Sequence, residues 1–142
     1  MFGWWLLLLA AFDSRHYWLP DPLTLPLVPL GLLVAAFDIG PPLAARAIGA
    51  AAGFASLHLV AVLYRAARGR EGLGGGDPKL FAAIGAWLGW AQLPLVLLAA
   101  GIAGLAALAL RRLRGERIAL GDRLALGALM AVAAWPLWLL VV

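Results

Sequence analysis

The chain has 142 residues, of which 65% are hydrophobic and only 13% are charged. This composition is far more apolar than that of an average soluble domain, so it indicates an integral membrane protein. The formal net charge of +4 does not indicate a nucleic-acid partner, because the basic residues gather in particular connections between apolar segments. The absence of cysteine excludes disulfides, thiol catalysis and cysteine-ligated zinc. We therefore expect one compact membrane domain over residues 1–142.

Six hydrophobic segments follow one another along the chain. They are expected at about residues 2–18, 23–37, 43–66, 77–90, 93–110 and 120–142. Since a span needs roughly 20 apolar residues, they predict an all-α membrane protein with about six transmembrane helices in one bundle. The pairs Gly49 and Gly53, and Gly85 and Gly89, lie four residues apart within their segments. This spacing favours close contact between helices.

The basic residues predict the orientation of the chain. Ten of the eleven lie in or beside the first, third and fifth connections, and only Arg46 does not. The ten are Arg15, Arg65, Arg68, Arg70, Lys79, Arg111, Arg112, Arg114, Arg117 and Arg123. Basic connections stay on the cytoplasmic side of a membrane. The acidic residues Asp13, Asp21 and Asp77 are then expected together at that face.

The longest polar connection ends in Gly74-Gly75-Gly76-Asp77 and leads directly into an apolar helix. An acidic residue in so apolar a chain is costly, which makes Asp77 a candidate functional residue. The glycines leave the backbone bare, so another segment can approach closely. The alternative is an ordinary cap beside a glycine turn, with Asp77 capping a helix that begins at Pro78.

A pair of carboxylates is the one catalytic arrangement that this composition supports. Two carboxylates that share a proton can hydrolyse a peptide bond: the ionised one takes a proton from water, and the protonated one donates to the carbonyl oxygen. A Ser-His-Asp triad cannot be assembled convincingly, because hydroxyl side chains are few and His58 lies inside an apolar segment. The residues alone leave Asp13 and Asp21 as candidate partners of Asp77.

Two separate motifs occur in order along the chain. The first is Asp13 with Leu19-Pro20-Asp21 and Leu23-Thr24-Leu25-Pro26-Leu27, and the second is Gly74-Gly75-Gly76-Asp77-Pro78-Lys79-Leu80, followed by Gly85-Ala86-Trp87-Leu88-Gly89-Trp90. Together they resemble the type IV prepilin peptidase family, which consists of membrane aspartic peptidases with a G-x-G-D motif. The resemblance extends from Asp13 to about Leu110, and residues 118–142 match it only loosely.

The resemblance implies an aspartic endopeptidase with Asp13 and Asp77 as its catalytic pair and with no metal or other cofactor. Its supporting residues would be Asp21, Lys79, Gly74 and Gly76. The family removes the basic leader of type IV prepilins or pseudopilins, which serve type IV pili and protein secretion, at the cytoplasmic face of the bacterial inner membrane. The partners implied are such a precursor and the lipid bilayer. Methyltransfer is not expected, because the family's additional cysteine-rich amino-terminal region is not in this sequence.

Several alternatives remain open at this stage. Asp21 is the chief competitor of Asp13, or else it caps the second helix. Lys79 is expected to tune the pKa of Asp77, to hold a substrate carboxylate or to meet lipid headgroups. Gly74 and Gly76 belong either to a loop that admits the substrate or to an ordinary flexible loop. A function of another class would be a non-enzymatic membrane scaffold, a transporter subunit or a degenerate peptidase.

Overall fold

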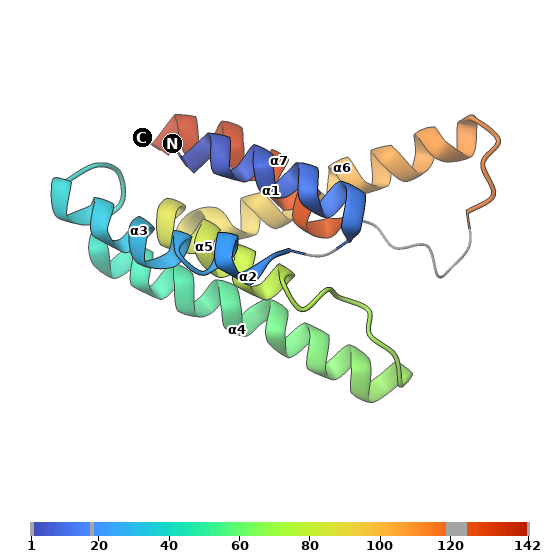
Figure 1. Ribbon diagram of the computed structural model, residues 1–142, viewed down its shortest axis with the longest axis horizontal. Coiled ribbons are helices and arrows are strands. Elements are labelled where there is room, and N and C mark those ends of the chain that lie inside the picture. Colours follow the sequence, from blue (N-terminus) through green and yellow to red (C-terminus); the bar gives the residue numbers. More distant parts are fainter. Residues whose placement is uncertain (1, 18, 119–124, 142) are drawn as a thin grey trace.

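The computed structural model describes residues 2–17, 19–118 and 125–141, and it contains helices and no strands in this part of the chain (Figure 1). Its elements are α1 (Phe2–His16), α2 (Asp21–Thr24), α3 (Leu27–Val34), η1 (Ala35–Phe37), α4 (Leu43–Arg68), α5 (Asp77–Leu88), η2 (Trp90–Gln92), α6 (Leu93–Leu113) and α7 (Leu126–Val141). The first helix packs beside the last, so the two ends of the chain lie together in Figure 1. The predicted all-α fold is confirmed.

The prediction of six spans is not confirmed over the described residues. Only the stretches Leu43–Arg68 and Trp90–Leu113 are long and apolar enough to cross a bilayer. The helix α5 has 12 residues, which extend over roughly 18 Å against roughly 30 Å for the hydrocarbon core. It ends early because Gly89 takes a φ of 80°, and α1 ends because Tyr17 takes a φ of 50°.

Two other expected segments also differ from the structure. The segment expected at residues 23–37 is divided into α2, α3 and η1, because Pro26 has no backbone N–H and stands between the first two of these helices. The last helix begins at Leu126 within the described part of the chain. The expected start of that helix and Arg123 fall in residues 119–124, and the expected end of the first helix falls at Trp18; all of these lie outside the described residues.

The two long stretches expose most of their apolar surface. Only 17% of the apolar window in Leu43–Arg68 and 22% of that in Trp90–Leu113 are buried, whereas the core helix of a soluble protein is mostly buried. Leu59 and Leu63 on α4 and Leu98 and Leu105 on α6 are among the exposed side chains. Apolar surface this extensive does not face water in a soluble monomer. The structure therefore supports the membrane character that the composition indicates.

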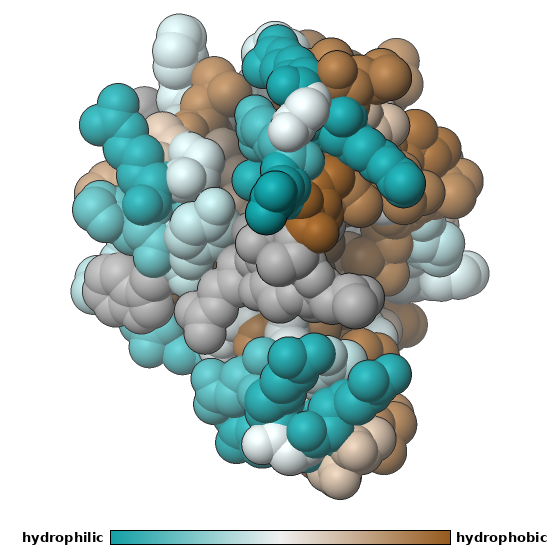
Figure 2. Space-filling model, turned by 90° about the vertical axis from the view of Figure 1, so that its right-hand side faces the viewer, coloured by the Kyte–Doolittle hydropathy of each residue, from teal (hydrophilic) through white to brown (hydrophobic). Residues whose placement is uncertain are grey.

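Hydrophilic side chains gather at one end of the molecule. Figure 2 shows this end, with groups of hydrophilic residues at the top, left and bottom of the view and hydrophobic residues mainly at the right. The end of α4 contributes the exposed Arg65 and Arg68, and the end of α6 contributes the exposed Arg112 and Arg114. Basic residues at both helix ends agree with the single basic face expected from the sequence.

The helix α5 is the centre of the fold, since ten of its twelve residues are buried. The helix α4 crosses it at glycines. A Cβ atom on Gly85 would lie 2.1 Å from the carbonyl oxygen of Gly49, and one on Gly53 would lie 2.7 Å from that of Phe81. No side chain fits at such distances, so glycine is required where these backbones approach. The close helix contact predicted from the Gly49 and Gly53 spacing is confirmed.

A buried arginine joins three segments at the other end of α4. Arg46 is 0% exposed. Its Nε donates to the carbonyl oxygen of Pro41 at 2.9 Å, its Nη1 donates to those of Gly31 at 2.8 Å and Ala86 at 3.4 Å, and its Nη2 donates to that of Ile39. One guanidinium thus bonds α3, α5 and the connection before α4.

Candidate active site

Asp13 lies on the buried face of α1. Phe2, Leu6 and Leu9 occupy the same face at helical spacing and are buried, and Asp13 follows four residues after Leu9. Asp13 therefore lies on the face of α1 that packs against the rest of the protein, where it is 4% exposed. Its Oδ2 accepts a hydrogen bond from the backbone N–H of Ala128, on α7, at 2.7 Å.

Asp77 is the first residue of α5 and is 6% exposed. Its Oδ2 accepts a hydrogen bond from the N–H of Gly74 at 3.2 Å, and its own N–H donates to the carbonyl oxygen of Gly74 at 3.2 Å. The cap position of α5 is Gly76, so the prediction that Asp77 caps a helix beginning at Pro78 is wrong by one residue. A Cβ on Gly76 would lie 2.6 Å from the Cβ of Leu19, so glycine lets this turn pack against Leu19.

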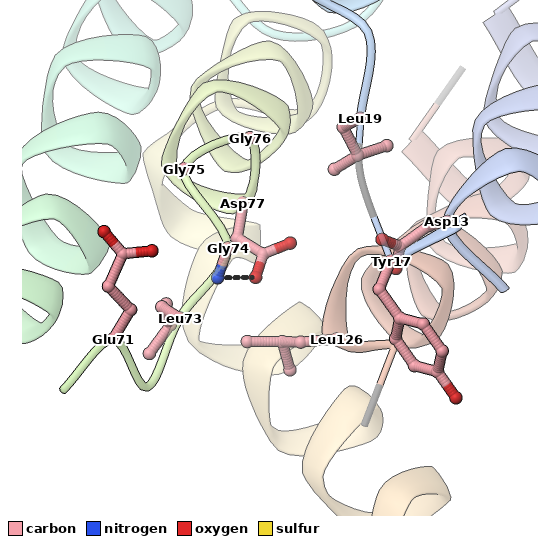
Figure 3. Close-up of a pocket in the computed structure, with 10 residues that line it drawn as sticks. All are labelled: Asp13, Tyr17, Leu19, Glu71, Leu73, Gly74, Gly75, Gly76, Asp77 and Leu126. Atoms are coloured by element: carbon pink, nitrogen blue, oxygen red, sulfur yellow. Dashed lines mark hydrogen bonds between the residues drawn. The ribbon is translucent and has the colours of Figure 1, made fainter. Parts of the chain in front are cut away.

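The two carboxylates converge beside Gly127 of α7. A Cβ atom on this glycine would lie 2.9 Å from Oδ2 of Asp13 and 3.1 Å from Oδ1 of Asp77. Because both distances start from the same point, the two carboxylate oxygens cannot be farther apart than the sum of these distances. Figure 3 shows the two carboxylates facing each other from α1 and α5. The fold thus brings together the two aspartates that the sequence analysis selected.

Both aspartates lie outside the two candidate spans, and their surroundings favour the protonated form. Burial raises the pKa of Asp77 to about 6; the negative charge of Asp13 is a second cause, and the N–H of Gly74 acts in the opposite direction. Burial also raises the pKa of Asp13, against the backbone N–H groups of Ala128 and Gly127. Two such close acids titrate as a unit. The pair therefore keeps one proton to a higher pH than a free aspartate does.

A pocket of about 80 Å³ gives access to the pair. It is lined by Asp13, Tyr17, Leu19, Glu71, Leu73, Gly74, Gly75, Gly76, Asp77 and Leu126 (Figure 3). This volume holds several water molecules. Over the described residues there is no group of three or more His, Cys, Asp or Glu side chains that could hold a metal ion. The arrangement can place water and a peptide carbonyl against two carboxylates.

Asp21 and Lys79 lie beside this pocket and do not line it. Nζ of Lys79 is 2.6 Å from Oδ1 of Asp21, so the two supporting residues expected from the sequence pair with each other. Lys79 also lines a second pocket of about 260 Å³, on the side of the 71–75 loop that faces α4. Of the two candidate partners of Asp77, the structure places Asp13 against it.

Sequence reasoning missed the first turn of α7. Gly127 and Ala128 contact the carboxylate pair, and Leu126 lines the pocket. Both contacts with Asp13 join residues more than a hundred positions apart, and one glycine among 17 does not stand out. Only the apolar segment expected at residues 120–142 could have pointed to this part of the chain.

Comparison with known families decides the relationship of this chain. Residues 1–109, about three quarters of the sequence, match the family model described as the type IV leader peptidase family. This chain belongs to the type IV leader peptidase family. The predicted resemblance is thereby confirmed, and both Asp13 and Asp77 fall within the matched residues.

Relatives of this family member carry the name prepilin leader peptidase/N-methyltransferase. The protein from Dickeya chrysanthemi is 46% identical over 125 residues, which cover 88% of this chain and 44% of the relative. The proteins from Dichelobacter nodosus and Neisseria gonorrhoeae are 40% and 37% identical, covering 95% and 94% of this chain and 46% and 49% of the relatives. The chain therefore spans less than half the length of these curated relatives. No solved structure matches it.

Proposed function

We propose that this family member forms a single membrane-embedded peptidase domain that cleaves the leader peptide of type IV prepilins or pseudopilins. The observation that carries the proposal is the convergence of Asp13 and Asp77 on one point beside Gly127, at the edge of a pocket open to water. The names of the relatives support the substrate class. The reaction is hydrolysis by an aspartic pair.

In this reaction the pair holds one proton when the substrate binds. The ionised carboxylate takes a proton from a water molecule, whose oxygen attacks the carbonyl carbon of the scissile peptide bond. The protonated carboxylate donates its proton to the carbonyl oxygen. When the C–N bond breaks, the nitrogen takes the proton that the base removed from water and leaves as an amine. The carbonyl oxygen returns its proton to the acid as the C=O bond re-forms, so the pair again holds one proton. The raised pKa of Asp77 supports its role as the acid. An aspartate with an ordinary pKa has already lost its proton well below neutral pH and has none to donate.

The proposed location is the cytoplasmic face of the bacterial inner membrane. The stretches Leu43–Arg68 and Trp90–Leu113 span the bilayer, and the remaining helices pack around α5. The loop from Glu71 to Gly76, which lines the pocket, follows the end of α4 that carries Arg65 and Arg68. Since basic connections stay in the cytoplasm, the pocket opens there. A prepilin leader is itself basic and reaches the enzyme from the same side.

The decisive experiment is cleavage of purified prepilins by the wild-type chain and by Asp13→Asn and Asp77→Asn, with products measured by mass spectrometry. Each substitution should lower kcat by about a thousandfold or more, because catalytic groups that act as a unit lose nearly all activity together. The matched control is Asp38→Asn: Asp38 is exposed, away from the pocket, with a φ of 54° that asparagine also accepts.

Two outcomes would contradict the proposal. Cleavage at the wild-type rate by Asp77→Asn would exclude the aspartic mechanism. Absence of cleavage by the folded wild-type chain against a panel of prepilin and pseudopilin leaders would favour the non-enzymatic scaffold or transporter subunit instead.

A further inference from the structure

The first turn of α7 contacts both carboxylates of the site. The helix begins at Leu126, so Gly127 and Ala128 carry backbone N–H groups that have no partner within the helix. We propose that these two are positioning residues: Ala128 holds Asp13 ionised as the base, which leaves Asp77 as the acid, and Gly127 keeps free the space between them. The inference rests on the proposed peptidase function and extends it to a segment that the sequence analysis left without a role.

Gly127 is buried at the point where the two carboxylates meet. The Cβ that this glycine lacks would lie 2.9 Å from Oδ2 of Asp13, 3.1 Å from Oδ1 of Asp77 and 2.8 Å from Cδ1 of Leu19. Carbon and oxygen atoms this close overlap, so a methyl group would push the carboxylates apart. It would also fill space beside both oxygens, which the water molecule of the proposed reaction needs. Glycine is needed here for the chemistry of the pair.

The hydrogen bonds distinguish the two aspartates. Oδ2 of Asp13 accepts from Ala128 at 2.7 Å, the short distance that is typical of a bond to an ionised group. Oδ2 of Asp77 accepts from Gly74 at 3.2 Å. Both carboxylates lie at a helix N-terminus, so the helix dipoles do not separate them. The shorter bond stabilises the charge on Asp13, and the shared proton accordingly resides on Asp77.

The first test is Gly127→Ala, assayed with purified prepilin. We expect kcat to fall about a hundredfold, as is typical when reacting groups move by about an ångström, with KM within about threefold of the wild-type value. KM is preserved because the methyl group enters the space between the carboxylates and leaves the outer walls of the pocket unchanged. The control is Gly101→Ala on α6, where a Cβ meets nothing within 4 Å; it should change neither constant.

A second pair of variants separates the carboxylates from the neighbouring leucine. Leu19→Ala removes Cδ1 of Leu19, which would lie 2.8 Å from the new methyl group. If the inference holds, Gly127→Ala combined with Leu19→Ala stays about a hundredfold below Leu19→Ala alone. Recovery of kcat in the double variant would show that the effect of Gly127 passes through packing on Leu19, and this would overturn the inference.

The assignment of the base is tested with Ala128→Pro, which removes the N–H that Asp13 accepts. Proline is tolerated in a first helical turn. Activity requires Asp13 ionised, and loss of the hydrogen bond raises its pKa, so the acidic limb of the kcat profile should move to higher pH. The other titratable groups lining the pocket are Tyr17, Glu71 and Asp77. Ala128→Gly keeps the N–H and should leave the limb in place.

These outcomes separate the inference from the function on which it rests. If Asp77→Asn cleaves as the wild type does, the proposed function fails. If the aspartate variants are inactive while Gly127→Ala keeps the wild-type kcat, or if Ala128→Pro leaves the acidic limb unmoved, only the role of α7 fails. A fall in melting temperature in detergent that parallels the loss of kcat in Gly127→Ala would also contradict a positioning role.

Discussion

Lys79 and Asp21 form an ion pair with their charged atoms 2.6 Å apart, and this pair joins the first turn of α5 to the start of α2. Asp21 therefore has a partner of its own, while Asp13 faces Asp77 across the pocket. The sequence alone leaves Asp13 and Asp21 as competing partners of Asp77, and in the fold it is Asp13 that lies beside Asp77. A supporting role for Asp21 and Lys79 stays a prediction.

This ion pair should matter little for stability and moderately for activity. Its side chains are 31% and 50% exposed, and exposed pairs contribute only about 0.2–1 kcal/mol. We expect Asp21→Asn and Lys79→Met to lower cleavage less than about tenfold, and a double-mutant cycle on unfolding to give a coupling below about 1 kcal/mol. Loss of cleavage in Asp21→Asn together with activity in Asp13→Asn would reverse the assignment.

The stability of the wild type should fall with rising pH relative to Asp77→Asn. The pKa of Asp77 is raised from 3.8 to about 6 in the folded protein, so between these values the folded state binds more protons than the unfolded state. Stability is then lost as the pH rises through this window. The amide of the Asp77→Asn variant cannot ionise, so this variant should melt at a higher temperature than the wild type near neutral pH. Melting curves in detergent at about pH 4 and about pH 7 test this, and an equal difference at both would contradict it.

The dependence of activity on pH should be bell-shaped. Cleavage requires one carboxylate ionised and the other protonated, so kcat/KM falls at low pH as Asp13 becomes protonated and at high pH as the pair loses its proton. The alkaline limb should lie near the pKa of Asp77, at about 6 for the free enzyme. Initial rates at substrate concentrations far below KM provide the measurement. Activity that rises steadily to alkaline pH would indicate a different acid.

Arg46 should be essential for stability and dispensable for chemistry. It is buried and satisfies the four backbone carbonyls of Gly31, Ile39, Pro41 and Ala86. Each buried carbonyl left without a partner costs about 1–3 kcal/mol. Arg46→Met should therefore lower the melting temperature strongly. Arg46→Lys should lower the melting temperature less than Arg46→Met, because the lysine ammonium can still donate hydrogen bonds to some of the four carbonyls. At a temperature where the variants are folded, kcat should match the wild type, since Arg46 does not line the pocket.

The orientation can be tested with single cysteines, because the chain has none of its own. Arg70 follows the end of α4, and Ile39 precedes its start, so the two lie on opposite sides of a span. Both side chains are exposed. Arg70→Cys should react with a membrane-impermeant maleimide only when the cytoplasmic side is open, and Ile39→Cys should react from outside in intact spheroplasts. The reverse pattern would place the pocket on the wrong side for a leader peptide.

The sequence by itself determined the helical class, the G-x-G-D turn, the two aspartates and the glycines Gly49 and Gly53 at the crossing of α4 and α5. These features are local. A glycine run followed by an acid, a helical spacing of small residues and a cluster of arginines each involve residues that are close together in the sequence. They can therefore be recognised without knowledge of the tertiary structure. The buried face of α1 could not be chosen in this way, because leucine occupies all of positions 6–9 and only the fold buries Leu6 and Leu9 and leaves Leu7 and Leu8 exposed.

Only the tertiary structure decided the contacts between distant segments. The N–H of Ala128 reaches Asp13 across 115 positions, and Lys79 reaches Asp21 across 58. The sequence analysis treated Arg46 only as the one basic residue outside the basic connections. In the structure its buried side chain donates hydrogen bonds to carbonyls of α3, α5 and the connection before α4. The prediction of six spans was also not confirmed over the described residues, since hydropathy does not show that the backbone turns at Tyr17 and Gly89. Such contacts depend on how helices pack, and no short pattern in the chain records which backbone groups packing will bring together.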